Sequence, residues 1–112
     1  MLSAMLWLIL FLCRHITTVL TACEVEPDQN GHVTIPASTT VIKERAFAQC
    51  TEMSSITINE NVISIGAGAF YGCNSISSVQ IPDSVTAIGR NAFHECRNLE
   101  NVTIGKGVVH LG

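Results

Sequence analysis

The sequence predicts a short solenoid, an α/β repeat in which each 23-residue unit contributes parallel strands and a short helical turn. One pattern recurs without a gap over residues 32–54, 55–77 and 78–100, and half a copy follows over residues 101–112. Apolar residues hold the same positions in every copy, so no unit can cover its apolar face alone. A fixed period of roughly 20 to 50 residues is typical of proteins in which stacked units cover one another.

The first half of each unit is expected to form two strands. In the third copy Val79, Gln80 and Ile81 alternate apolar, polar and apolar, which indicates a half-buried strand. Pro82 comes next, and proline ends a strand because it cannot donate to the ladder. A second extended segment ends at Gly89, where we expect a turn in a conformation that favours glycine. Two other copies carry the matching residues Gly66 and Gly112.

The second half of each unit predicts a short helix of one or two turns. In the third copy Ala92, Phe93 and Cys96 lie three and four positions apart, which is the spacing of one helical face. Phenylalanine recurs at one position of the three full copies, as Phe47, Phe70 and Phe93. We expect these rings to form a column in the core, because stacking places equivalent residues side by side.

Three of the five cysteines also share one repeat position, as Cys50, Cys73 and Cys96. Stacked neighbours lie about 4.8 Å apart with parallel Cα–Cβ directions, which does not suit the geometry of a disulfide. We therefore expect a buried column of free thiols that act as small apolar residues. Cys13 belongs to the N-terminal segment, and Cys23 is the one cysteine expected to be exposed.

Residues 81–99 follow the pattern I-P-x-S-V-x-x-I-G-x-x-A-F-x-x-C-x-x-L, which resembles the BspA-like leucine-rich repeat family, also called the Treponema pallidum type. The resemblance implies a right-handed leucine-rich-repeat solenoid, often secreted or exposed on the cell surface and used in adhesion and protein–protein contact. It implies no catalytic residues, because the motif contains none. The first copy departs from the motif with Thr39 in place of valine and Lys43 in place of glycine, as an atypical terminal repeat would.

Residues 1–23 differ from the repeats and are expected to be a signal peptide or a hydrophobic anchor. The apolar run over residues 5–13 has the length of a signal-peptide core, whereas a spanning helix would place Arg14 near the bilayer centre. The run before Cys23 also resembles a lipoprotein box, which would attach a lipid to that sulfur. A cytosolic chain or a wrongly assigned start is the remaining alternative. Residues 24–31 are acidic and turn-rich, and are expected to form a linker or N-terminal cap.

Composition narrows the range of partners. Hydrophobic residues make up 47% of the chain and charged residues 13%, which excludes a disordered protein. The net charge of −3, with few and scattered basic residues, argues against nucleic acid as a partner. Membrane contact is expected only through residues 1–23, if they are retained. The chain stops at Gly112 inside a fourth unit, so we expect either a longer array or self-association through an open C-terminal edge.

The sequence predicts no cofactor, no metal site and no enzyme activity. Cys73, His94 and Cys96 lack the close cysteine spacing of structural zinc sites. His94, Glu95 and Cys96 are adjacent on one short segment, so their side chains would point in different directions and could not converge on a substrate. Phosphate-binding loops and hydrolase motifs are absent from the sequence.

The candidate functional feature is therefore a surface. The residue between the two inward positions of each first strand should form an outward polar row, namely Thr34, Thr57, Gln80 and Thr103. His32, Ser55 and Ser78 flank this row. A second, less regular row falls on the predicted helical turns, at Gln49, Gly72 and Glu95 with Tyr71 and His94 beside them. The sequence does not choose between the two faces.

Two functions remain open at this point. The first is a non-catalytic, secreted or cell-surface module that binds protein or a surface polymer. The second is a structural spacer or capping piece of a longer array, with no ligand of its own. Asn101 begins a glycosylation sequon, which would matter if the chain is exported from a eukaryotic cell.

Overall fold

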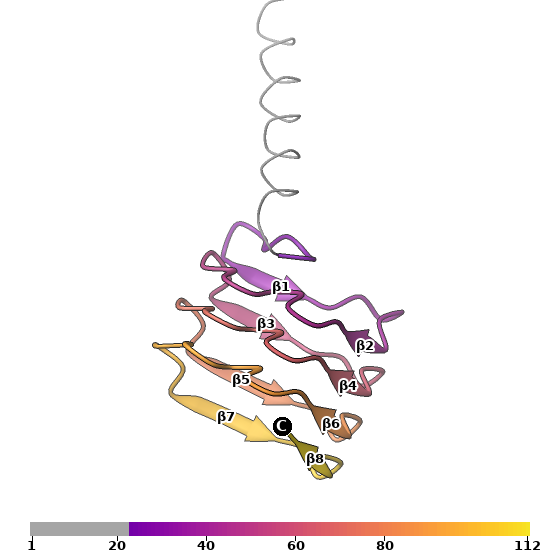
Figure 1. The fold of residues 1–112 in the computed structure, drawn as a ribbon. Helices are drawn as coiled ribbons and strands as arrows, with labels where there is room; N and C mark the ends of the chain where they lie inside the picture. The colour runs from indigo at the N-terminus through magenta and orange to yellow at the C-terminus, as the bar shows by residue number, and fades with distance from the viewer. Residues whose placement is uncertain (1–22) are drawn as a thin grey trace, which may run out of the picture.

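The computed structural model describes residues 23–112, and the predicted signal peptide or anchor falls outside this range apart from Cys23. Within the described range, no helix has the length and apolar character needed to cross a bilayer. The chain winds into four stacked coils, seen from the side in Figure 1, each of which carries one longer and one shorter strand.

The strands follow the predicted period. The longer strands are β1 (His32–Thr34), β3 (Ser55–Thr57), β5 (Ser78–Ile81) and β7 (Asn101–Ile104). The shorter strands are β2 (Val41–Ile42), β4 (Ser64–Ile65), β6 (Ala87–Ile88) and β8 (His110–Leu111). All paired strands run parallel, and Val33 lies opposite Ile56 while Val79 lies opposite Val102. The parallel solenoid with a 23-residue spacing is thus confirmed.

The two strand faces are not equally continuous. The shorter strands form one four-stranded sheet in the order β2-β4-β6-β8. The longer strands form two separate pairs, β1-β3 and β5-β7. β3 and β5 lie side by side (Figure 1), yet within residues 23–112 no backbone hydrogen bond joins them. The backbone hydrogen bonds between the second and third coils therefore lie on the other faces of the stack.

The predicted helix is not confirmed, because the structure has consecutive turns in its place. In the first coil the amide of Cys50 donates to the carbonyl of Phe47 at 3.1 Å, a turn of i to i+3 type. The amide of Phe47 itself donates outward to Ala69 of the next coil at 2.7 Å. Alternate amides thus close local turns and reach the neighbouring coil, whereas an α-helix directs every interior amide to the residue four earlier.

The backbone dihedrals explain why a helix cannot form here. Two residues in each turn segment have left-handed φ angles: Arg45 (58°), Gln49 (58°), Gly68 (61°), Gly72 (70°), Asn91 (57°) and Glu95 (60°). A right-handed helix requires negative φ at every residue. The three-and-four spacing of the apolar residues, which predicted a helical face, instead marks the inward residues of a segment that pairs with its neighbours.

The recurring glycines after the shorter strands are needed for a reason other than the one expected. Gly66 and Gly89 do not have left-handed φ angles. A Cβ built on Gly66 would lie 2.5 Å from the amide nitrogen of Glu44 in the coil above. The position is thus reserved for glycine by the close approach of two backbones. Lys43 is tolerated at the same position of the first coil, which no further repeat precedes within residues 23–112.

The core is a set of columns along the stack. The rings of Phe47 and Phe70 stack with centroids 5.5 Å apart, and those of Phe70 and Phe93 with centroids 5.1 Å apart. Phe47 and Phe70 are fully buried and Phe93 is half-buried, as expected for core residues. No polar or charged residue in the described range is buried.

The cysteine column is only partly as predicted. Cys73 and Cys96 are free thiols, and each donates a hydrogen bond to a carbonyl of the preceding coil. The structure pairs Cys50 with Cys23 in a disulfide, with Cα atoms 5.4 Å apart, so the prediction of a free Cys50 is wrong. The spacing that excludes a disulfide holds between stacked cysteines of the column, and Cys23 lies outside the column. Cys23 approaches from residues that cover the first coil, where Glu24 donates its amide to Ala46 at 2.9 Å.

The middle of the phenylalanine column should dominate stability. We expect Phe70→Ala to lower the free energy of unfolding by about 3–5 kcal/mol, because it removes a fully buried ring between two others. Phe93→Ala removes the same atoms from a half-buried site and should cost less. Urea denaturation of the two variants measures both values. An unchanged midpoint for Phe70→Ala would contradict the stacked core.

The close approach at the glycine column gives a second expectation. Gly66→Ala should destabilise the fold by about 1–3 kcal/mol, because the added methyl group overlaps the backbone of the coil above. Lys43→Ala, at the matching position of the first coil, should leave the melting temperature within about 2 °C, since Lys43 forms an exposed ion pair. Thermal melting measures both effects. Equal changes in melting temperature for the two substitutions would show that the coil spacing is not the reason for glycine at residue 66.

Candidate functional site: the longer-strand face

The predicted polar row lies on the face of the longer strands. All four of its members are exposed: Thr34, Thr57, Gln80 and Thr103. Thr34 lies opposite Thr57 in the β1-β3 pair, and Gln80 lies opposite Thr103 in the β5-β7 pair. The row is therefore continuous in register, although the sheet beneath it is interrupted between β3 and β5.

The flanking residues are partly engaged within the fold. His32 and Ser55 are half-buried, and the imidazole Nδ1 lies 2.6 Å from the hydroxyl of Ser55. The imidazole Nε2 lies 3.0 Å from the hydroxyl of Thr57. Ser78 is exposed. The first two coils thus use part of the predicted surface to hold β1 against β3, and the free polar groups lie farther along the stack.

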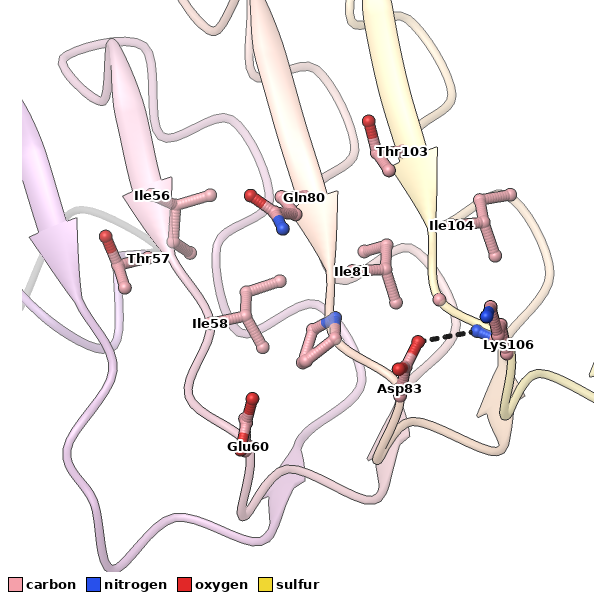
Figure 2. A pocket seen from close by; sticks show the side chains of 12 residues that line it. Ile56, Thr57, Ile58, Glu60, Gln80, Ile81, Asp83, Thr103, Ile104 and Lys106 are labelled. Carbon is pink, nitrogen blue, oxygen red and sulfur yellow. Dashed lines mark hydrogen bonds between the residues drawn. The ribbon is translucent and has the colours of Figure 1, made fainter.

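Near the end of the row the face is hollowed, with a volume of about 480 Å³ (Figure 2). The hollow takes in three of the predicted row residues, Thr57, Gln80 and Thr103. It lies across the ends of β3, β5 and β7, and so includes the place where β3 and β5 are not hydrogen bonded. The backbone groups of β3 and β5 make no bond to one another here.

Charged residues beside the hollow were missed by the sequence prediction. Glu60, Asp83 and Lys106 occupy one repeat position in successive coils and all line it (Figure 2). Asp83 accepts a hydrogen bond from the backbone amide of Lys106 at 2.8 Å, which holds its carboxylate beside the turn. Their sequence signal is a position that changes in charge from copy to copy, beginning with Ala37 in the first.

The second predicted row has a different character. Tyr71 and His94 stack with ring centroids 5.7 Å apart, so successive coils place aromatic rings together on the turn face. Gln49 and Glu95 are exposed, while Gly72 is buried between them. The glycine interrupts the row, and no row of side chains continuous over all coils forms here.

The free cysteines lie among core residues, away from both surfaces. Burial raises the pKa of the Cys73 thiol to about 12, and burial also raises the pKa of Cys96. A thiol that stays protonated is a poor nucleophile and a poor metal ligand. Among residues 23–112 no three histidine, cysteine or acidic side chains come together as a metal site.

The comparison with protein families agrees with this architecture. A family model described as the BspA-type leucine-rich repeat region (6 copies) matches residues 28–112. The chain belongs to the BspA-type leucine-rich repeat family. The resemblance found in the motif is thereby confirmed. None of the curated proteins compared with the chain matches it.

Two solved structures of similar fold are large relative to this chain. One is a leucine-rich cell surface protein from Faecalibacterium prausnitzii, with 35% identity and a TM-score of 0.61 over 63% of this chain and 18% of that one. The other is the pneumococcal vaccine antigen PcpA, with 21% identity and a TM-score of 0.61 over 74% of this chain and 22% of that one. The second shows a shared fold alone. This BspA-type chain spans about a fifth of each.

The remaining predicted site residue, Asn101, is exposed at the first position of β7. Its backbone amide donates to the carbonyl of Ser77 at 3.3 Å, so the main chain is tied to the preceding coil while the side chain faces solvent. An exposed amide side chain is what a glycosylation acceptor requires, and its modification stays a prediction.

Thiol reactivity tests the buried column. We expect Cys73 in the native protein to resist alkylation by iodoacetamide at pH 8, because its pKa of about 12 keeps it protonated. Cys23 and Cys50 should be unlabelled without reductant. The stability contributed by the protonated Cys73 thiol is complete below its ordinary pKa of 9.0 and is lost as the pH rises toward 12. Mass spectrometry of the labelled peptides measures the extent of alkylation at each cysteine. Rapid alkylation of Cys73 in the native protein would contradict the structure.

Proposed function

We propose that this chain is a non-catalytic binding module, placed outside the cell, whose longer-strand face holds a protein or a surface polymer. The observation that carries the proposal is the hollow of about 480 Å³ at the interruption between β3 and β5, where exposed polar and charged side chains meet. Repeat proteins commonly bind through extended surfaces built from equivalent positions of successive units.

The chemistry of the hollow suits a polar partner. Thr57, Gln80 and Thr103 supply hydroxyl and amide groups that both donate and accept hydrogen bonds. Glu60 and Lys106 add charges of opposite sign at the rim. Because the charge at this position differs from coil to coil, the two ends of the hollow are not equivalent. A bound chain of complementary charge would therefore be favoured in one orientation and one register.

The extracellular location is supported by the relatives and by the cysteine pairing. The Faecalibacterium prausnitzii relative is described as a cell surface protein. The pairing of Cys23 with Cys50 requires an oxidising compartment such as the exterior of the cell. The same pairing disfavours the lipoprotein alternative, because a sulfur atom in a disulfide cannot also carry a lipid. Export fits these observations, with Cys23 retained in the mature chain, so that a cleaved signal peptide would have to end before Cys23.

A second role, as a spacer within a longer array, is favoured by a separate observation. The last coil exposes large apolar side chains at positions that inner coils bury: Val102, Ile104 and Leu111. Within residues 23–112, β7 pairs only with β5 and β8 pairs only with β6, so one edge of each strand has no paired neighbour. A further copy of the 23-residue unit would cover this edge in the register that joins the other coils, and a second copy of the chain would do so by self-association.

Blocking the hollow tests the proposed binding face. The double variant Gln80→Arg/Thr103→Arg fills the hollow with long side chains while leaving the core unchanged. We expect it to bind immobilised mucin or extracellular-matrix proteins at least about tenfold more weakly than the parent, in a biosensor assay with the full chain. The loss follows because both residues lie inside the proposed contact.

The matched control is Ser38→Arg/Asn74→Arg, which adds the same charge at exposed positions outside the hollow. It should bind as the parent does. A loss of equal size in the control would show that added charge, and not the hollow, decides binding. Failure of the parent to bind any of these surfaces would favour the spacer role instead.

A further inference from the structure

A small notch of about 150 Å³ lies on the turn face, away from the hollow of the longer strands. Residues of three successive coils line it: Glu44, Arg45, Ala67, Gly68, Tyr71, Arg90 and Asn91. The backbones beneath it are joined from coil to coil, because Arg45 donates its amide to Ala67 at 3.1 Å and Gly68 donates to Arg90 at 2.9 Å. The floor of the notch is thus rigid main chain.

The notch exists because the middle coil carries small residues where its neighbours carry long ones. Arg45, Gly68 and Asn91 hold one repeat position, and all three have left-handed φ angles. A Cβ on Gly68 would lie 3.5 Å from the side chain of Arg45 and 3.8 Å from that of Tyr71. The missing side chain of Gly68 therefore opens a space between an arginine and a tyrosine.

Two arginines, Arg45 and Arg90, line this space together with one acidic residue, Glu44. The one ion pair among residues 23–112 joins Lys43 to Glu24 at 3.7 Å, and neither Arg45 nor Arg90 takes part in one. Both arginines are exposed and line the same notch, from the coils on either side of Gly68. Two arginines that line one small space offer the planar, doubly donating groups that bind a carboxylate.

The remaining residues of the notch suit a sugar ring. Tyr71 is half-buried and is braced from one side by the imidazole of His94, with the two ring planes inclined at 30°. A fixed aromatic side chain packs against the C–H groups of a sugar, while Asn91 and Glu44 offer an amide and a carboxylate to its hydroxyls. The volume is below the roughly 300–1,000 Å³ of a drug-sized site, so it fits one ring and its acidic group.

We propose that this notch is a binding site for a carboxylated sugar unit, such as a uronic acid, in which Arg45 and Arg90 hold the carboxylate and Tyr71 packs against the ring. The site is separate from the longer-strand hollow. It lies on the turn face, whereas the hollow lies on the face of the longer strands. The two sites fail or succeed independently in experiments, because they share no residue.

Titration of the ¹⁵N-labelled full chain with sodium glucuronate tests the proposal by chemical shifts. We expect saturable shifts at the backbone amides of Gly68 and Tyr71, whose residues line the notch. Glucose lacks the carboxylate and acetate lacks the ring, so each should bind at least about tenfold more weakly. Glucose or acetate binding as tightly as glucuronate would overturn the assignment to a carboxylated sugar.

Three variants locate the site. Arg45→Gln removes one guanidinium, and Gly68→Asn fills the notch with a residue that Asn91 shows to be tolerated in the same backbone conformation. Each should raise the dissociation constant for glucuronate by about tenfold or more. Arg97→Gln removes an exposed arginine outside the notch and should change nothing. Unaltered binding by Gly68→Asn, or equal weakening by Arg97→Gln, would refute the site.

Discussion

The hydrogen bonds between successive coils set the distance on which the rest of the structure depends. Gly66 donates its amide to Ile42 at 2.7 Å and Phe70 donates to Ala92 at 2.8 Å, on two different faces of the stack. Adjacent coils are thereby held at the spacing of neighbouring β-strands. This spacing brings the phenylalanine rings into stacking distance and leaves room for no side chain at Gly66. The hollow of about 480 Å³ lies where these bonds are missing, between β3 and β5.

Side chains reinforce the same spacing at the turns. Asn59 donates its amide group to the carbonyl of Pro36 at 2.9 Å, and Asn61 donates to Ala37 at 2.9 Å. Ser84 donates its hydroxyl to Val62 at 2.7 Å. Each of these bonds runs from one coil to the one before it, and together they satisfy turn carbonyls that no strand can reach. Polar side chains of the repeat thus help to hold successive coils together, in addition to the apolar side chains of the core.

The repeat could be predicted from sequence because its cause is local and periodic. Burial of Val33, Ile42 and Phe70 follows from their recurrence at fixed positions, and recurrence alone places them in columns. The outward row of Thr57 and its equivalents followed from strand alternation in the same way.

The errors arose where the pattern has more than one physical cause. Residues 91–96 have helical spacing, but Asn91 and Glu95 have left-handed φ angles, as do Arg45 and Gln49 at the matching positions of the first coil, whose amides donate to the next coil. No residue-type rule revealed this. Gly66 is glycine because of a backbone in another coil rather than its own conformation. The pairing of Cys50 with a residue outside the repeat breaks the periodicity, so periodic reasoning did not find it. The charged rim of the hollow was likewise missed, because it consists of positions where the copies differ.

The direction of the hydrogen bonds also has a mechanical consequence. They point from coil to coil, along the axis of the stack, and the chain enters at one end of that axis and leaves at the other (Figure 1). Tension between the two ends therefore pulls on the bonds of one interface at a time. Each coil that opens would release roughly 80 Å of extended chain. The disulfide between Cys23 and Cys50 keeps the first coil closed under the same load. Under such tension the fold would therefore lengthen by one coil at a time, beginning at the end away from the disulfide.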